Sequence, residues 1–191
     1  WYSRGLPDPN RLIDRTVAQT TKLYDRTGER VLYEIHGAEK RSVVPLDTIP
    51  AAVRQATLVA EDRSFYGHGG ISVRGIIRAS LSHLTGIGRG GGGSTLTQQL
   101  VKNAILTNEQ RISRKLREWV LAWRIEQQFS KDEILQMYLN EIPYGGTSYG
   151  IQSAARSYFG KDVGQLTLAE SASLAAITNA RPKIAPYPFT T

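Results

Sequence analysis

The longest helical pattern in the chain is RISRKLREWVLAWRIEQQF at residues 111–129, and it decides the fold class. Its apolar residues recur at helical spacing along two sides. One side carries Leu116, Trp119, Val120 and Trp123, and the nearly opposite side carries Leu121, Ile125 and Phe129. A helix that is apolar on both sides leaves no face for water, so we predict that it is central and buried.

Further helical patterns lie on both sides of this segment. They are expected at 51–62 behind Pro50, at 71–84, from Ser94 onward, at 131–138 after Ser130, at 151–159 and at 168–177. In the first of these, the apolar stripe is expected at Val53, Ala56, Val59 and Ala60. Residues 21–35 have the pattern of a β-hairpin, with a turn signal between two apolar runs. We therefore predict a mainly α domain at 48–191, preceded by a membrane-proximal arm with a small β-hairpin at 1–47.

Composition and charge narrow the classes of function. The 191 residues include 24 Lys and Arg, 17 Asp and Glu, and no Cys. Hydrophobic residues make up 40% and charged residues 21%, which excludes a disordered chain. The absence of Cys excludes a disulfide scaffold, a zinc–thiolate site and a cysteine nucleophile. The net charge of +7 favours an anionic partner, such as nucleic acid, acidic lipid or a phosphorylated substrate.

The start of the chain indicates a fragment. It begins with Trp1 rather than Met, and no apolar run reaches the roughly 18–20 residues that cross a bilayer. The stretch WYSR at 1–4 joins aromatic residues to a cation, which is typical of a segment next to a membrane span. We expect that a membrane anchor precedes this chain, although an arbitrary starting point explains the same residues.

Two adjacent carboxylates, Glu61 and Asp62, end the helix predicted at 51–62. The helix dipole disfavours carboxylates at this end, so they require either a nearby cation or a function. A carboxylate in such a setting is suited to general acid or base catalysis. A solvent-exposed helix end with Arg63 and His68 close by explains the same pattern, and the local sequence leaves both interpretations open.

A second candidate site is the stretch GGSTLTQQLVKN at 92–103. Glycines followed by hydroxyl residues at a helix start can offer free backbone N–H groups to an anion. Thr95, Gln98 or Gln99, and Lys102 recur at helical spacing and would present amides and a cation to a phosphate. The alternative is a glycine linker before an ordinary helix that Thr95 and Gln98 close with a capping box.

A third candidate lies in RISRKLRE at 111–118, where one Glu stands among several cations. Arg111, Arg114 and Glu118 share one helical face at 100° per residue. This arrangement predicts either a simple ion pair or a binding site.

Together, these three stretches and two further ones resemble the five motifs of the family 51 peptidoglycan glycosyltransferases. That family comprises the polymerase domain of bifunctional penicillin-binding proteins and the monofunctional transglycosylases. The matches, in the family's order, are EDRSF with His68 and Gly70, GSTLTQQ with Lys102 and Asn103, Arg114-Lys115 with Glu118, Ile134-Leu135 with Tyr138-Leu139-Asn140, and Leu168 with Glu170 and Leu174. The resemblance covers nearly the whole chain.

The resemblance implies a two-lobed, lysozyme-like fold and an inverting transfer on lipid II, a disaccharide-pentapeptide carried on polyprenyl pyrophosphate. It makes Glu61 the general base. It makes Glu118 a second carboxylate that acts through a divalent cation, Mg²⁺ or Mn²⁺, or by orienting cations. The substrate-binding residues that it implies are Lys102, Arg114, Lys115, Ser94, Thr95, Gln99, Asp62, Phe65, His68 and Asn140.

The partners that the resemblance implies are lipid II and the nascent glycan strand, with moenomycin as an inhibitor and no nucleic acid. The location it implies is the extracytoplasmic face of the bacterial cytoplasmic membrane. The basic amphipathic stretch at 71–84, with Arg74 and Arg78, predicts contact with lipid head groups, unless it is an ordinary surface helix. The glycine run at 86–93 is expected to open and close over the donor site.

Some positions depart from the family pattern, and two other functions compete with it. Gln110 stands where members often have a cation, and Pro143 stands where an aromatic residue is common, with Tyr144 next. One competing function is a lysozyme-like hydrolase or lytic transglycosylase, which has no need of the phosphate-binding cations Lys102 and Arg114. The other is a non-catalytic module that binds anionic lipid.

Overall fold

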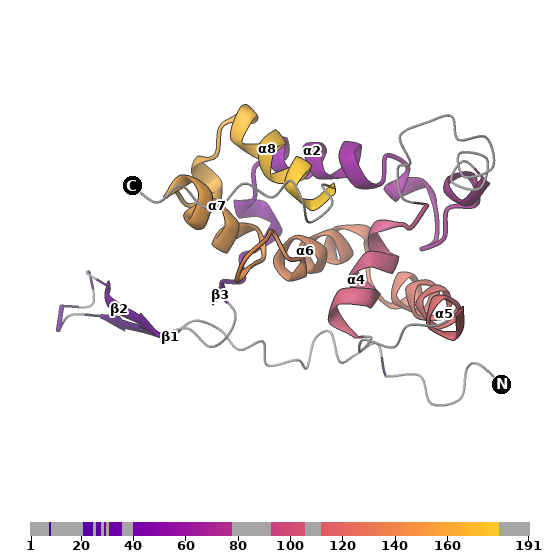
Figure 1. Ribbon diagram of the computed structural model, residues 1–191, viewed down its shortest axis with the longest axis horizontal. Coiled ribbons are helices and arrows are strands. Elements are labelled where there is room, and N and C mark those ends of the chain that lie inside the picture. The colour runs from indigo at the N-terminus through magenta and orange to yellow at the C-terminus, as the bar shows by residue number, and fades with distance from the viewer. Residues whose placement is uncertain are drawn as a thin grey trace.

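The computed structural model describes residues 8, 21–24, 26–27, 29, 31–35, 40–77, 93–105 and 112–179. Helices dominate these residues and the strands are short (Figure 1). The predicted mainly α fold is confirmed, and it is consistent with a lysozyme-like domain. The glycine run before Gly93, the stretch at 78–84, Gln110 and Arg111 lie outside the described residues.

The helices follow the predicted boundaries closely. They are α2 (Ala51–Glu61), α4 (Leu96–Ala104), α5 (Ile112–Gln128), α6 (Lys131–Glu141), α7 (Ile151–Phe159) and α8 (Leu168–Asn179). Residues 73–77 are also helical. Short 3₁₀ turns lie at η1 (Leu46–Thr48), η2 (Phe65–Gly67) and η3 (Val163–Gln165). Capping boxes start α4 at Thr95 and α6 at Ser130, and Gly160 ends α7 in the left-handed conformation.

The strands form two small sheets. The predicted hairpin is confirmed: β1 (Thr21–Tyr24) pairs antiparallel with β2 (Val31–Ile35), with a register shift between Leu23 and Tyr24. The short strand β3 (Lys40–Arg41) pairs in parallel with β4 (Ser148–Tyr149), more than 100 residues further along the chain. This second sheet fastens the arm to the helical body.

The central helix is α6, so the prediction that the segment 111–129 is central was wrong. In Figure 1, α6 lies in the middle of the helices and α5 lies at their edge. Ile134, Leu135, Tyr138 and Leu139 of α6 are all fully buried. Helix α6 contacts α4, α5, α7 and η1, so its sides are covered by different partners.

Helix α5 buries only one side fully. Leu121, Ala122 and Ile125 are fully buried, whereas Trp123 is 53% exposed. The helix packs mainly against α4, and the side that carries Trp123 is half-buried at Trp119 and Val120. The sequence pattern was apolar on both sides, but only the side facing α4 is fully buried.

The apolar stripe predicted for α2 was partly wrong. This helix packs side by side with α8 (Figure 1). It buries Val53 and Thr57 fully, while Val59 is 57% exposed. The buried positions are spaced i, i+4, so the face turned to the core includes a threonine that a purely apolar count overlooks.

Candidate active site

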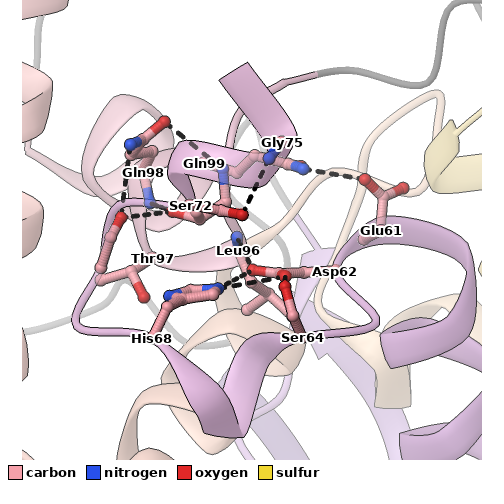
Figure 2. A network of polar contacts seen from close by, with 12 residues as sticks. Glu61, Asp62, Ser64, His68, Ser72, Gly75, Leu96, Thr97, Gln98 and Gln99 are labelled. Carbon is pink, nitrogen blue, oxygen red and sulfur yellow. Dashed lines mark hydrogen bonds and ion pairs between the residues drawn. The ribbon is translucent and has the colours of Figure 1, made fainter. Parts of the chain in front are cut away.

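Glu61 is the last residue of α2, and its carboxylate lies between α4 and α8. The side-chain amide of Gln99 donates to Oε2 at 2.8 Å, as Figure 2 shows. The hydroxyl of Thr178 donates to Oε1 at 3.0 Å. Both donors are uncharged, and no ion pair links Glu61 to a cation among the described residues.

The orientation of Gln99 follows from a buried tyrosine. The hydroxyl of Tyr138 in α6 donates to Gln99 Oε1 at 3.2 Å, which leaves the amide nitrogen facing Glu61. Burial, together with the charge of Glu61, raises the pKa of Tyr138 well above its ordinary value. Tyr138 therefore keeps its proton and remains a donor.

Asp62 is adjacent in sequence but has charged surroundings (Figure 2). Its carboxylate is 2.9 Å from Nε2 of His68 and accepts a hydrogen bond from the Leu96 amide at 3.1 Å. Burial by itself raises the pKa of Asp62, but the hydrogen bonds from His68 and Leu96 and the charges of His68 and Lys131 outweigh burial and lower it. Asp62 is therefore a fixed anion that joins the end of α2 to the start of α4.

A second cluster surrounds Glu118 on α5, which is only 3% exposed. Its Oε2 is 2.7 Å from Lys115 Nζ, and its Oε1 is 3.3 Å from Arg114 Nε. Lys115 also donates to the hydroxyl of Ser94 at 2.8 Å. Two cations on one carboxylate leave a surplus of one positive charge, which favours an anionic ligand.

The start of α4, from Ser94 to Gln99, connects the surroundings of Glu61 and Asp62 to the cluster around Glu118. Ser94 contacts Lys115, the Leu96 amide contacts Asp62, and Gln99 contacts Glu61. The hydroxyl of Thr95 and the side chain of Gln98 turn the other way and donate to the carbonyl of Gly70, at 2.6 and 3.3 Å. The anion at this helix start is thus the carboxylate of Asp62, so α4 is a capped helix rather than an open N–H site.

Gly70 allows the loop at residues 62–70 to approach α5. Its φ of +82° is disfavoured for other residues, and a Cβ here would lie 2.8 Å from the carbonyl oxygen of Ala122. This close approach lets the Gly70 carbonyl meet Thr95 and Gln98, and it fixes the loop 62–70 against α4 and α5.

The structure does not bring Phe65, Lys102 and Asn140 to the Glu61 carboxylate through any contact. Phe65 is buried, with the ammonium of Lys131 4.4 Å from its ring centre. Lys102 is exposed near the end of α4 and makes no ion pair with another described residue. Asn140 is buried, and its amide bonds both backbone groups of Val44, at 2.9 and 2.8 Å, so it holds the arm on α6.

Comparison with known proteins adds to this geometry. The sequence profile of the transglycosylase family matches residues 28–189. The chain belongs to the transglycosylase family. It is 40% identical over 97% of its length to penicillin-binding protein 1A of Rickettsia bellii, and 42% identical over 96% to that of Aquifex aeolicus. It is also 42% identical over 83% of its length to penicillin-binding protein 1A of Neisseria cinerea.

The family match confirms the resemblance and the enzyme class, a peptidoglycan glycosyltransferase domain. The chain spans about a quarter of the length of the relatives from Rickettsia bellii and Aquifex aeolicus, 24% and 25%. The match to the transglycosylase profile begins at residue 28, inside the arm predicted at 1–47.

Lys131 is a charged residue of this transglycosylase domain that the sequence motifs did not single out. Lys131, in the first turn of α6, bonds the Glu126 carboxylate and the His68 carbonyl, both at 2.6 Å. Glu126 also accepts from the hydroxyl of Thr97 at 2.6 Å. A Lys at the positive end of a helix dipole is unfavourable by itself, and this anomaly after the Ser130 cap was the available signal.

Two features are absent from the described part of the chain. No group of three or more His, Cys, Asp or Glu side chains there is placed to hold a metal ion. No helix there is long and apolar enough to span a bilayer.

Proposed function

We propose that this transglycosylase domain polymerises lipid II into a glycan strand at the extracytoplasmic face of the bacterial cytoplasmic membrane. The observation that carries the proposal is the contrast between Glu61 and Asp62. Asp62 is paired with His68, whereas Glu61 is held by the neutral donors Gln99 and Thr178. A carboxylate without a counter-ion is the better proton acceptor, which supports Glu61 as the general base.

The step needs one proton acceptor and one stabilised leaving group. The 4-hydroxyl of the acceptor sugar loses its proton to Glu61 as its oxygen bonds to the anomeric carbon of the donor. The bond from that carbon to the pyrophosphate breaks with inversion, and its electron pair leaves with the polyprenyl pyrophosphate. The balance is one glycosidic bond formed, one phosphate ester bond broken and one proton held on Glu61.

The Glu118 cluster is suited to the leaving group. The side chains of Arg114 and Lys115 are 28% and 43% exposed, while that of Glu118 behind them is 4% exposed. The cations can therefore reach an arriving pyrophosphate while Glu118 keeps them oriented. Charge-assisted bonds from such cations stabilise the negative charge that develops on the phosphate oxygens. Lys102 is a third exposed cation for the same substrate.

A divalent cation, Mg²⁺ or Mn²⁺, enters this proposal only as a companion of the substrate. Mg²⁺ is commonly held by one or two carboxylates together with substrate phosphates. Glu118 is the carboxylate available in the cluster, but both of its oxygens contact cations. No chemical step is therefore assigned to the metal.

Contact with the membrane surface is supported by exposed apolar residues near the loop at residues 62–70. Val73 and Ile77 are 65% and 54% exposed and flank the exposed Arg74, and Trp123 on α5 is 53% exposed. Gly70, three residues before Val73, packs against Ala122, the residue before Trp123 on α5. Apolar side chains next to cations are typical of an interfacial surface, and we call Val73, Ile77 and Trp123 the apolar surface.

Identification of the product tests the proposal. The wild-type chain and Glu61→Gln are incubated with fluorescent lipid II, with Mg²⁺ or with EDTA, and products are separated by gel electrophoresis. We expect a ladder of glycan strands from the wild type alone. Moenomycin should abolish the ladder by competing for the donor site, and loss in EDTA would assign a role to the divalent cation.

Other products would contradict the proposal. A chain that shortens preformed glycan but makes no ladder would be a hydrolase or lytic transglycosylase. A chain that makes no product and binds neither lipid II nor moenomycin would be a module for anionic lipid.

A further inference from the structure

Thr178 lies in the last turn of α8, 117 positions along the chain from Glu61. Its hydroxyl is 3.0 Å from Glu61 Oε1 and 2.9 Å from the carbonyl oxygen of Ala175 in the preceding turn. A hydroxyl has one proton, so it donates to only one of these oxygens at a time. The geometry therefore provides two alternative hydrogen bonds for the same group.

We propose that Thr178 is a positioning residue for the catalytic carboxylate of Glu61, an inference that rests on the proposed function. While Glu61 is ionised, the hydroxyl donates to Oε1 and, opposite Gln99, fixes the carboxylate. Once Glu61 has taken the proton from the acceptor sugar, the hydroxyl donates to the Ala175 carbonyl, and its oxygen can accept from the neutral acid. Only hydrogen bonds change, and the transferred proton stays on Glu61.

No other described partner of Glu61 can serve both states. The Gln99 nitrogen is a donor only, and the Gln99 oxygen already accepts from Tyr138. A rigid donor suits the ionised carboxylate, whereas a hydroxyl can be either donor or acceptor. Thr178 therefore supports the base before and after proton transfer.

The titratable side chains near Glu61 come from α6, from the residue that follows α6 and from the loop that follows α2. Tyr138 in α6 and Tyr144 just after α6 have pKa values raised by burial and by the charge of Glu61, so both stay neutral. Asp62, next to Glu61 on α2, is paired with His68 on the following loop. A hydrogen bond donated to a carboxylate favours its charged form. Loss of the Thr178 donor should therefore move the acid limb of the rate profile to higher pH.

The test compares Thr178→Val, which keeps the shape and removes the hydroxyl, with Thr178→Ser, which keeps the hydroxyl. Ser173→Ala is the matched control, because Ser173 is exposed on the same helix and its hydroxyl donates to the Ala169 carbonyl. For each variant, kcat and KM for lipid II are measured between pH 5 and 9, beside wild type and Glu61→Gln.

We expect Thr178→Val to lower kcat about tenfold at low pH, the scale of one hydrogen bond to a charged group. KM should change little, the acid limb should move to higher pH, and Thr178→Ser should restore most of the rate. An unchanged profile for Thr178→Val would overturn the positioning role, as would equal losses in Val and Ser variants. If the wild type makes no glycan, or if Glu61→Gln remains active, the proposed function itself fails and the role of Thr178 fails with it.

Discussion

At the scale of single residues, Glu61 and Asp62 show how neighbours in sequence acquire different surroundings. Glu61 is the last residue of α2, and Asp62 follows it with non-helical backbone angles, φ −154° and ψ 80°. The change of backbone conformation sends Glu61 toward Gln99 and Thr178 and sends Asp62 toward His68 and Leu96. The first contacts hold the carboxylate that we propose as the base, and the second hold the loop that follows it.

Asp62→Asn should destabilise the fold most strongly near neutral pH. Asparagine keeps the size but loses the charge-assisted bonds from His68 and the Leu96 amide, which we expect to cost about 1–3 kcal/mol. The pKa of Asp62 is lowered in the folded state, so its stabilising contribution is present above the unfolded pKa of about 3.9 and is lost as pH falls through the folded value. Urea unfolding between pH 3 and 7 measures both effects.

The matched control for this prediction is Asp47→Asn, because Asp47 is exposed in η1. The difference between wild type and Asp62→Asn should shrink below about pH 4, where Asp62 of the unfolded chain takes up a proton while that of the folded protein is still ionised. A difference that stays constant from pH 3 to 7 would contradict the assigned charge.

At the scale of elements, the sequence predicted what is locally determined. The capping box at Thr95 and the helix start after Ser130 depend on residues within four positions, and both are present. The β-hairpin is equally local. Among the candidate site residues, the pairing of Arg114 with Glu118 also followed from spacing along one helix, whereas Lys115 was named only through the family resemblance.

The sequence could not predict which side of each helix meets a protein partner. Helix α5 is apolar on two sides, but burial was decided by the position of α4, and Trp123 remains exposed. The contact from Thr178 to Glu61 joins α8 to α2, and no local pattern marks it. Asn140 belongs to a recognised motif, but its role in holding Val44 depends on the path of the arm.

The ion pair between Lys131 of α6 and Glu126 of α5 leads to a prediction about how these two helices stabilise each other. Lys131→Met leaves the Glu126 carboxylate, whose side chain is 4% exposed, with Thr97 as its one remaining partner among the described residues, and should cost about 2–4 kcal/mol. Glu126→Gln should cost less, and the double variant should lose less than the sum of the two. A double-mutant cycle by urea unfolding measures the coupling, and strictly additive losses would contradict the contact.

At the scale of the whole molecule, charge and exposed apolar residues both favour an anionic membrane surface. The net charge of +7 supplies long-range attraction, which salt weakens. The apolar surface, Val73, Ile77 and Trp123, supplies a contribution that depends less on salt. On such a surface the protein would reach the pyrophosphate of a lipid-linked substrate just outside the lipid.

Removal of the apolar surface should weaken binding to vesicles. We expect Val73→Asp/Ile77→Asp to reduce binding to vesicles of equal phosphatidylglycerol and phosphatidylcholine by about tenfold, because two apolar side chains no longer insert into the lipid. Val59→Asp is the matched control, because Val59 is 57% exposed on α2 and lies outside this surface. Flotation at low and moderate salt measures the effect, and equal losses in both variants would contradict the assigned surface.

The central claim is that Glu61 accepts the proton of the acceptor sugar. The most direct measurement is the initial rate of glycan formation from lipid II by Glu61→Gln relative to wild type, with the melting temperature of each protein. We predict a rate lower by about 10²–10⁴-fold, with a melting temperature within about 3 °C of wild type. A rate within about threefold of wild type, well short of the loss expected for a general base, would contradict the claim.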